Sequence, residues 1–425
     1  MIEHVTGGRS ARLMFYCHDT YGLGHLRRTL TLATDLRRRW PSTSQLIVTG
    51  SPVAQSFPYP PGADYVKLPA VVKTRAGRYE ARSIATSFEA VRDMRRDILL
   101  SAARHFNPDA FIVDHAPAGL EGEAVATLRY LKEQSLRTRL ILGLRDILDE
   151  APRVRSTWQR EGIHELLDNL YDRILVYGTP ELYDVVAEYG LSPRAAAKTR
   201  YVGYLRRPPA ARTRDEVRAE LGVCSNRLVV VTAGGGGDGG DLFRSIADAI
   251  RHEPAANGYD WLLVAGPLMA EAELADLRAR VGPRAGVHLL DFAEDLASYL
   301  AAADAVVSMG GYNSVCEILS LNCPALIVPR VHPRREQLIR AEGLSRRNLI
   351  RMLNPKELSP RRLLTEIDTL VSTRRDGQVV DLDGLSRVAA ELDALWWEPR
   401  PALPPVPAAG WFDTLPAIAA TPAVA

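Results

Sequence analysis

Cysteine is scarce in this sequence, with four residues among 425, at positions 17, 224, 316 and 323. They contain no CxxC pair and no disulfide framework, so we expect a chain that folds in a reducing cytosol. Apolar runs of the roughly 18 residues that cross a bilayer are missing, and the first residues lack the apolar segment of a signal peptide. We expect a cytoplasmic protein with at most peripheral contact to the inner face of the cell membrane.

An excess of charge of one sign is also missing. The 53 Lys and Arg residues nearly balance the 51 Asp and Glu residues, giving a net charge of +2, which argues against a dedicated nucleic-acid binder. The hydrophobic content of 46% and charged content of 24% are ordinary for a globular protein. A length of 425 residues favours two domains.

Short apolar segments alternate with helix-like segments along most of the chain. The expected strands are 11–17, 45–50, 64–69, 110–114, 139–144, 173–178, 227–233, 261–266, 287–292, 305–310 and 324–329. The clearest expected helices are 26–39, 86–106 and 242–251. This alternation predicts an α/β protein with two doubly wound, Rossmann-like domains. Ligands of such folds lie at the carboxyl ends of the strands, here facing a cleft between the domains.

The composition suggests where the parts begin and end. The predicted parts are a flexible N-terminus (1–10), an N-terminal α/β domain (11–200), a linker (201–209), a second α/β domain (210–375), a C-terminal helix (384–397) and a disordered Pro/Ala-rich tail (398–425).

The first strand-to-helix junction is DTYGLGHLRR, at 19–28. Gly22 and Gly24 permit close approach of a ligand to the backbone, and His25 follows at the expected helix start. A histidine with a pKa near 6.5 can take a proton from a hydroxyl nucleophile; the alternative role is a helix cap. Asp114 ends a buried strand and could orient His25, act as the base itself, or cap a loop.

The second junction is TAGGGGDGGDLF, at 232–243. Its glycines at 234, 235, 236, 237 and 239 lie between a strand and a helix, where free amides and the helix dipole favour a phosphate or diphosphate. Gly234, Gly236 and Gly239 also match GxGxxG, but the next strand ends without the acidic residue of a dinucleotide site. The alternative is a flexible loop without a ligand.

The third junction follows the strand 305–310. Gly310 and Gly311 end the strand, and Asn313 or Ser314 could cap the next helix. Glu317 has capping-box spacing from Ser314, and its alternative role is to accept hydrogen bonds from a ribose diol.

The following strand, 324–329, runs into a polar cluster: Arg330, His332, Arg334, Arg335, Glu336 and Gln337. A solvated helix face is the alternative for its arginines. In the first half, Lys73 belongs to a basic loop that either meets an anionic acceptor or is simply solvated.

With these motifs the chain resembles the nucleotide-sugar glycosyltransferases of GT-B architecture, and it is most similar to the branch of the lipid-linked peptidoglycan N-acetylglucosaminyltransferase (glycosyltransferase family 28-like) and its bacterial relatives. The resemblance covers roughly residues 11–350 and is strongest over 227–345. It implies a linker arginine near the diphosphate at Arg206, a base-binding segment at Phe292-Ala293, and a ribose-binding glutamate at Glu317. The family's paired sugar-contacting glutamines become Glu336 and Gln337, a departure that leaves the sugar open.

The resemblance implies a donor that is a nucleoside-diphosphate sugar, with uridine favoured, and a hydroxyl acceptor that is lipid-linked, a polysaccharide or a small metabolite. We expect inversion at the anomeric carbon, no obligatory metal and no cofactor, with His25 as base. The alternatives are a nucleotide-sugar hydrolase, a non-catalytic nucleotide-sugar-binding subunit and, less favoured, a UDP-sugar 2-epimerase or an oxidoreductase.

Overall fold

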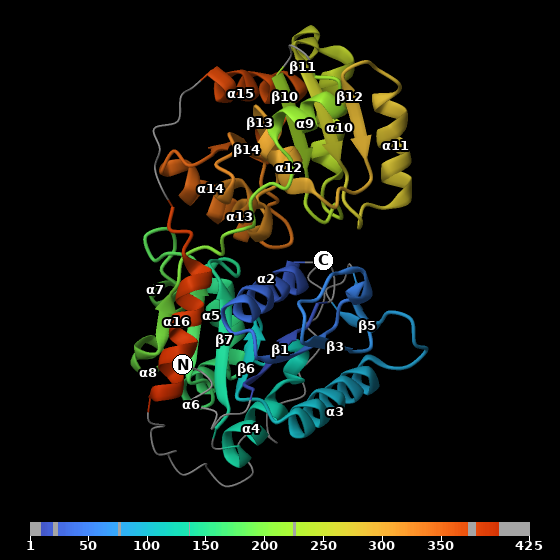
Figure 1. Ribbon diagram of the computed structural model, residues 1–425. Coiled ribbons are helices and arrows are strands. Elements are labelled where there is room, and N and C mark those ends of the chain that lie inside the picture. Colours follow the sequence, from blue (N-terminus) through green and yellow to red (C-terminus); the bar gives the residue numbers. More distant parts are fainter. Residues whose placement is uncertain are drawn as a thin grey trace.

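The computed structural model describes residues 10–19, 24–74, 78–135, 137–223, 227–372 and 380–398. Two parallel sheets, one in each half of the chain, lie one above the other and have helices on both faces (Figure 1). This is the predicted α/β class with two Rossmann-like halves. The predicted flexible N-terminus and Pro/Ala-rich tail lie outside the described residues, apart from Ser10 and Glu398.

The first sheet has seven strands in the order β3-β2-β1-β6-β7-β8-β9. Its strands are β1 (Arg12–Cys17), β2 (Ser44–Thr49), β3 (Ala63–Lys67), β6 (Ala110–Asp114), β7 (Arg139–Arg145), β8 (Arg173–Tyr177) and β9 (Thr199–Tyr201). A separate antiparallel hairpin pairs β4 (Val71–Lys73) with β5 (Tyr79–Ala81).

Helices cover both faces of this sheet. One face packs against α2 (Gly24–Arg39) and α16 (Gly384–Trp397). The other face packs against α3 (Phe88–Phe106), α4 (Val125–Gln134), α5 (Ala151–Arg160), α6 (Ile163–Asn169), α7 (Val185–Tyr189) and α8 (Pro193–Ala197). Helix α16 therefore returns to the first half of the molecule.

The second sheet has six strands in the order β12-β11-β10-β13-β14-β15. Its strands are β10 (Arg227–Thr232), β11 (Tyr259–Val264), β12 (Val287–Leu290), β13 (Ala305–Ser308), β14 (Ala325–Ile327) and β15 (Arg351–Met352). One face packs against α10 (Gly240–His252), α11 (Glu271–Val281) and α15 (Pro360–Ser372). The other packs against α9 (Arg214–Glu220), α12 (Leu296–Ala302), α13 (Tyr312–Ser320) and α14 (Glu336–Arg346). Short 3-10 turns lie at Ala54–Ser56, Leu120–Gly122, Pro254–Gly258 and Pro355–Glu357.

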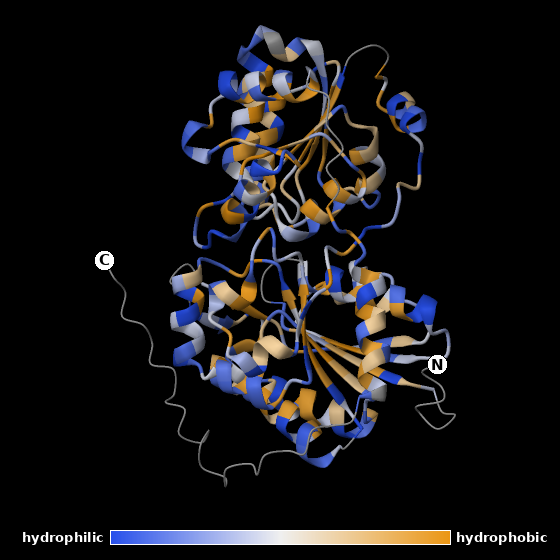
Figure 2. Cartoon of the chain, turned by 90° about the vertical axis from the view of Figure 1, so that its left-hand side faces the viewer, coloured by the Kyte–Doolittle hydropathy of each residue, from blue (hydrophilic) through white to orange (hydrophobic). Residues whose placement is uncertain are grey.

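The strands are apolar on both faces because successive side chains point to opposite helical layers. In β1, Leu13 and Phe15 join the core under α2, whereas Met14 and Tyr16 join the core under α3 and α4. Hydrophobic strands accordingly run through the middle of each half in Figure 2. Within the described residues, no helix combines the length and the apolar character needed to cross a bilayer.

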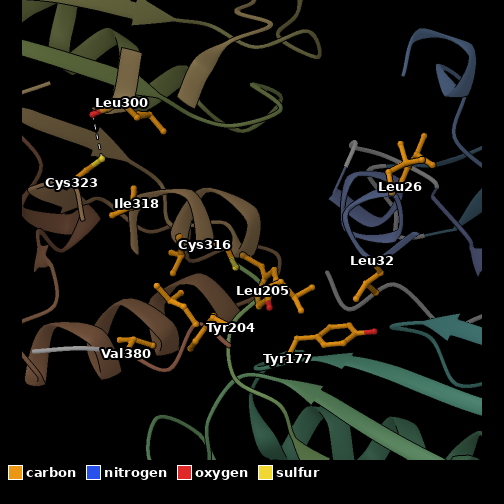
Figure 3. Close-up of a cluster of buried hydrophobic side chains, with 14 of the residues drawn as sticks. Leu26, Leu32, Tyr177, Tyr204, Leu205, Leu300, Cys316, Ile318, Cys323 and Val380 are labelled. Atoms are coloured by element: carbon orange, nitrogen blue, oxygen red, sulfur yellow. Dashed lines mark hydrogen bonds between the residues drawn. The ribbon is translucent and has the colours of Figure 1, made fainter. Parts of the chain in front are cut away.

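The two halves share one apolar core at their junction. Tyr204 and Leu205 are buried between the sheets and belong to the same cluster as Leu26 and Cys316 (Figure 3). The chain crosses between the halves a second time before α16, and the two crossing segments touch. The amide of Tyr204 donates to the carbonyl of Asp381 at 2.8 Å, and the amide of Gly384 donates to the carbonyl of Tyr204 at 3.2 Å.

The expected helices and strands are present with shifts of a few residues at their ends. The helix expected at 86–106 begins at Phe88, because the Ser87 side chain caps it by accepting from the amide of Ala90. The sequence analysis missed β4, β5, β9 and β15, each only two or three residues long.

Candidate active site

In each sheet the strand order reverses at one point, and the candidate residues lie at these two points. In the first sheet β1 lies between β2 and β6; in the second, β10 lies between β11 and β13. The connections from β1 and β10 and those from the neighbouring strands run to opposite sides of the sheet. This leaves a crevice at the carboxyl ends of these strands, where ligands of doubly wound sheets bind. His25 follows β1 and Asp114 ends β6, whereas the glycine loop follows β10 and Gly310 follows β13.

His25 and Asp114 are in direct contact. The Nδ1 atom of His25 lies 2.7 Å from Oδ2 of Asp114. Arg28, one turn further along α2, donates to both carboxylate oxygens of Asp114, from Nε at 2.7 Å and from Nη2 at 2.6 Å. An ionised carboxylate only accepts hydrogen bonds, so we assign the proton to Nδ1 of His25. This assignment leaves Nε2 of His25 with a free lone pair.

Asp114 is held in its ionised form. Its burial would raise the pKa of the carboxyl, but the Arg28 charge and the His25 hydrogen bond outweigh burial and lower the pKa well below its usual range. The carboxylate orients the imidazole of His25 and leaves Nε2 as the acceptor atom of the ring.

Two further histidines surround His25. The ring centroid of His18 lies 4.5 Å from that of His25, and the His115 centroid lies 5.0 Å away on another side. Burial lowers the pKa of both His18 and His115, so both remain neutral near pH 7. His115 directly follows Asp114, and His18 directly follows β1; the sequence analysis gave neither a role.

The glycine loop makes a tight turn between β10 and α10. Gly234 and Gly236 have positive φ angles of 66° and 91°, and a Cβ atom on Gly236 would lie 2.4 Å from the carbonyl oxygen of Ala265. The amides of Gly234, Gly236 and Gly239 donate within the loop, to Thr232, Ala233 and Gly236. These three amides are therefore engaged within the loop.

Two other amides of this loop are not used within the turn. The amides of Gly235 and Gly237 have no hydrogen-bond acceptor within the described part of the chain. Gly239 occupies the N-cap position of α10, and no side chain caps this helix. The first-turn amides of α10 are therefore the unpaired donors that attract an anion at a helix N-terminus.

Helix α13 begins beside this loop. Its N-cap is Gly311 and no side chain caps it, so neither Asn313 nor Ser314 is a cap, and the capping-box role considered for Glu317 is wrong. Ser314 instead faces the glycine loop, because a Cβ on Gly234 would lie 3.3 Å from its Oγ.

Asn313 and Glu317 reach across to the first half of the chain. The Nδ2 atom of Asn313 donates to the carbonyl oxygen of Gly24 at 3.0 Å. The Oε1 atom of Glu317 accepts from Nη2 of Arg27 at 2.5 Å, and its Oε2 atom is buried without a partner in the described residues. The two strand-order reversal points therefore meet at α2 and α13. Gly22, the other glycine of the first junction, lies outside the described residues.

The linker arginines differ in placement. Arg206 is exposed, whereas Arg207 is buried between the halves. Arg207 donates from Nη2 to Oδ1 of Asn313 at 2.5 Å and from Nη1 to the hydroxyl of Thr31. The sequence analysis chose Arg206 and missed Arg207.

Phe292 and Ala293 follow β12 at the same edge of the second sheet. The side chain of Phe292 is 54% exposed, which is unusual for a large apolar residue and leaves its ring free to stack. Ala293 is half-buried against the shared core.

Glu336 and Gln337 open helix α14. Arg330 holds this helix start, donating from Nη2 to Oε1 of Glu336 at 2.6 Å and from its amide to Oε1 of Gln337 at 3.0 Å. Its Nη1 atom pairs with Asp238 of the glycine loop at 2.5 Å. The Oε2 atom of Glu336 is buried and has no partner within the described ranges. Arg330 thus ties the start of α14 to the glycine loop.

One buried ion pair joins the halves beneath these residues. Arg340 donates from Nε and Nη2 to the two carboxylate oxygens of Asp146, both at 2.7 Å, and both side chains are almost completely buried. Nη1 of Arg340 donates to the carbonyl of Gly310 at 3.1 Å, and the Tyr204 hydroxyl donates to Asp146 at 2.8 Å. The sequence analysis missed this pair. Asp146 directly follows a buried strand, and Asp114 is the last residue of one.

Among the described residues, no three His, Cys, Asp or Glu side chains are grouped to hold a metal ion. The charged groups of the site are instead cross-linked by arginines.

Comparison with known proteins supports a particular family for the second half. Residues 229–379 match the glycosyltransferase family 28 C-terminal domain. A curated relative from Acetivibrio thermocellus, named UDP-N-acetylglucosamine--N-acetylmuramyl-(pentapeptide) pyrophosphoryl-undecaprenol N-acetylglucosamine transferase, is 26% identical over 165 residues, 38% of this chain and 44% of the relative. The chain thus spans less than half the length of such relatives. An uncharacterized glycosyltransferase from Methanosarcina acetivorans is 23% identical over 79% of this chain and 84% of its own length.

Solved structures share the fold across both halves. The calicheamicin glycosyltransferase CalG4 superposes with a TM-score of 0.59 and 17% identity, covering 92% of this chain and all of the other. A putative UDP-N-acetylglucosamine 2-epimerase from Listeria monocytogenes gives 0.61 and 14% over 92% of this chain and 98% of the other. The likeness establishes the GT-B arrangement of the two sheets, which both kinds of enzyme use.

Proposed function

We propose that this chain, whose second half is a glycosyltransferase family 28 C-terminal domain on the GT-B fold, transfers a sugar from a nucleoside-diphosphate sugar to an acceptor hydroxyl. The observation that carries the proposal is the contact between the two strand-order reversal points. Asn313, beside the glycine loop, donates to the carbonyl of Gly24, and the next residue is His25. A base and an anion-binding loop therefore face one another across a single interface.

The donor would lie along the second sheet. The first-turn amides of α10, with Gly235 and Gly237, would receive the diphosphate. Glu317 would accept from the ribose, the exposed ring of Phe292 would stack on the base, and Glu336 and Gln337 would face the sugar. A uridine nucleotide is favoured because the relative from Acetivibrio thermocellus is named for UDP-N-acetylglucosamine.

The acceptor would approach from the first sheet. Nε2 of His25 would take the proton of the acceptor hydroxyl while its oxygen attacks the anomeric carbon and the bond to the diphosphate breaks. Asp114 would hold the resulting imidazolium. A single displacement of this kind inverts the anomeric carbon.

Charge on the leaving diphosphate would be stabilised by amide donors and arginine. Arg207 is the buried linker arginine, and its Nε atom has no partner within the described residues. Positive groups of this kind make a metal ion dispensable, and we propose that none is obligatory.

The acceptor class and the location follow from the relatives. The peptidoglycan enzymes are named for an undecaprenol-linked acceptor, so we propose a lipid-linked or polysaccharide acceptor and action in the cytoplasm, at the inner face of the membrane.

The test is to incubate the protein with UDP-N-acetylglucosamine and UDP-glucose and to measure UDP release with and without lipid-linked acceptors. We expect release to depend on the acceptor. His25→Gln and Asp114→Asn should lower turnover by about 10²–10⁴-fold and leave UDP affinity unchanged, and exposed His105→Gln serves as the control. Equal UDP release without acceptor would indicate a hydrolase, and interconversion of the sugar at carbon 2 an epimerase. Unchanged turnover in His25→Gln would remove its role as base.

A further inference from the structure

Arg145 contacts His115, whose ring lies next to that of His25, and forms no ion pair with a carboxylate of the described residues. It is the last residue of β7, whose neighbour β6 ends with Asp114, and Asp114 pairs with Gly143 in the strand register. Among the described residues, its hydrogen-bond contact is from Nη2 to Nε2 of His115, at a long 3.4 Å. Its Nε atom is buried and unpartnered there.

The charged side chains nearest to Arg145 are paired with one another rather than with Arg145. Arg28 is committed to Asp114, and Arg340 is committed to Asp146. The carboxylate that faces Arg145 from the second half, Glu336, is held by Arg330. Burial, and then the charges of Arg28, Arg340 and Arg334, lower the pKa of Arg145 to about 10, against the opposing effect of Glu336.

Arg334 adds a second unpaired cation from the opposite half. It lies in the segment between β14 and α14, half-buried, and forms no ion pair with any described residue. The residues on either side of Arg334 contact the first half. The carbonyl of Pro333 accepts from Nη1 of Arg153 at 2.7 Å, and the amide of Arg335 donates to Oδ1 of Asp149 at 2.9 Å. Arg334 therefore lies at the interface with the first half.

The β4–β5 hairpin supplies a third cation. Lys73 lies over the ring of Tyr79, with 5.1 Å from Nζ to the centroid, and burial and the charge of Arg334 lower its pKa. Glu121 raises the pKa of Lys73, and the charge of Arg153 lowers it. Arg153 is itself paired with Asp149.

A partly buried guanidinium without a partner is costly, because removing a charge from water is repaid only by a counter-charge or by hydrogen bonds. Arg28 and Arg340 are each paired with a buried carboxylate. Arg145 and Arg334 are half-buried, and neither forms an ion pair within the described residues.

We infer that Arg145 and Arg334, with Lys73 at the edge, form a subsite for an anionic group, a phosphate or a carboxylate, on the acceptor. The inference rests on the proposed function, since it places this anion beside the hydroxyl that His25 deprotonates. The acceptor is the source rather than the donor, because the donor diphosphate has its own loop after β10. His115, which Arg145 contacts, belongs to the first half, as does the hairpin that carries Lys73.

The test uses the full-length protein saturated with UDP, so that the donor diphosphate site is filled. Phenyl phosphate, benzoate and neutral phenyl β-glucoside are titrated as acceptor mimics by isothermal calorimetry or ligand-observed NMR. We expect the two anions to bind more tightly than the glucoside, and their affinities to fall at least tenfold in Arg145→Gln and in Arg334→Gln. Arg335→Gln, the neighbouring arginine whose partner is Glu150, is the matched control and should leave the affinities unchanged. Preference for phenyl phosphate or for benzoate would identify the anion.

Two results would overturn the inference. One is anion binding that is absent, or equal in wild type, Arg145→Gln and Arg334→Gln. The other is a loss of affinity in Arg145→Gln for UDP-glucuronic acid but not for the acceptor mimics. That result would show that Arg145 binds an anionic group of the donor sugar. A failure of the proposed function is seen separately, as an absence of UDP binding, and anion titration without UDP then still tests the subsite.

Discussion

Arg27 and Glu317 form an ion pair across the two halves of the chain, with 2.5 Å between Nη2 and Oε1. The pair occupies one oxygen of the carboxylate that we assign to the donor ribose. A ribose diol that binds both oxygens of Glu317 must therefore displace Arg27.

Removing this competitor should strengthen donor binding. The Arg27 side chain is 36% exposed, so the ion pair contributes at most about 1 kcal/mol, and we expect Arg27→Gln to lower the Kd for UDP by up to about fivefold. Calorimetric titration measures the change. Arg38→Gln, which breaks a pair with Asp35 on the same helix, should have no effect. Weaker binding in Arg27→Gln would show that Arg27 itself contacts the nucleotide.

The buried pair between Arg340 and Asp146 should be essential for stability. Asp146→Asn leaves the Arg340 charge buried without its partner, which costs about 3–5 kcal/mol. Urea unfolding followed by fluorescence measures this loss. Asp276→Asn breaks an exposed pair with Arg280 on one helix and should have a much smaller effect, because solvent screens the pair. A similar small loss in Asp146→Asn would contradict the assigned role.

The glycine loop should tolerate no side chain at Gly236. A methyl group there would collide with the Ala265 carbonyl and would also require a positive φ, so Gly236→Ala must displace the loop. We expect at least a tenfold loss of UDP affinity. Gly258→Ala, at a position with open space and no positive φ, is the control. Retained affinity in Gly236→Ala would exclude this loop from the diphosphate site.

Stability should fall as pH drops below about 6.5, because of His18 and His115. Their folded-state pKa values are lowered by burial, so below the unfolded value of about 6.5 the unfolded chain binds protons that the folded chain does not. Each histidine then removes up to about 1.4 kcal/mol of unfolding free energy per pH unit. The lowered pKa of Asp114 acts in the same direction, but only below about pH 4.

The melting temperature between pH 7.5 and 5 measures this slope. The double variant His18→Gln, His115→Gln should flatten it, and exposed His105→Gln should not. An equal slope in wild type and the double variant would show that the two rings are protonated in the folded state.

Most of the architecture could be predicted from the sequence, because strands buried on both faces are continuous apolar runs. The placement of His25 and Asp114 followed from the same pattern, since both lie at strand ends that adjoin in a doubly wound sheet. The resemblance pointed to Arg206, and the burial of Arg207 was not foreseen. The chain is extended there, with Leu205 and Arg207 buried and Arg206 exposed between them, as the two-residue period of an extended chain requires.

Contacts between the halves could not be predicted in this way. Arg27 and Glu317 are 290 residues apart, and Arg340 and Asp146 are 194 apart. Their pairing depends on how the two sheets are placed, which no local pattern encodes. The capping role considered for Glu317 had the right spacing, but the helix begins at Tyr312, so Ser314 and Glu317 both lie inside it.

The paired crossing segments near Tyr204 and Asp381 restrict how the halves can move. A single flexible tether would allow one half to twist and swing in any direction. Two chain segments joined by backbone hydrogen bonds act instead as a two-point hinge. Such a hinge favours rotation of the halves about one axis. Along that axis the first turns of α2 and α13 would separate and rejoin in the same register, so each turnover would return His25 to the same position relative to the glycine loop.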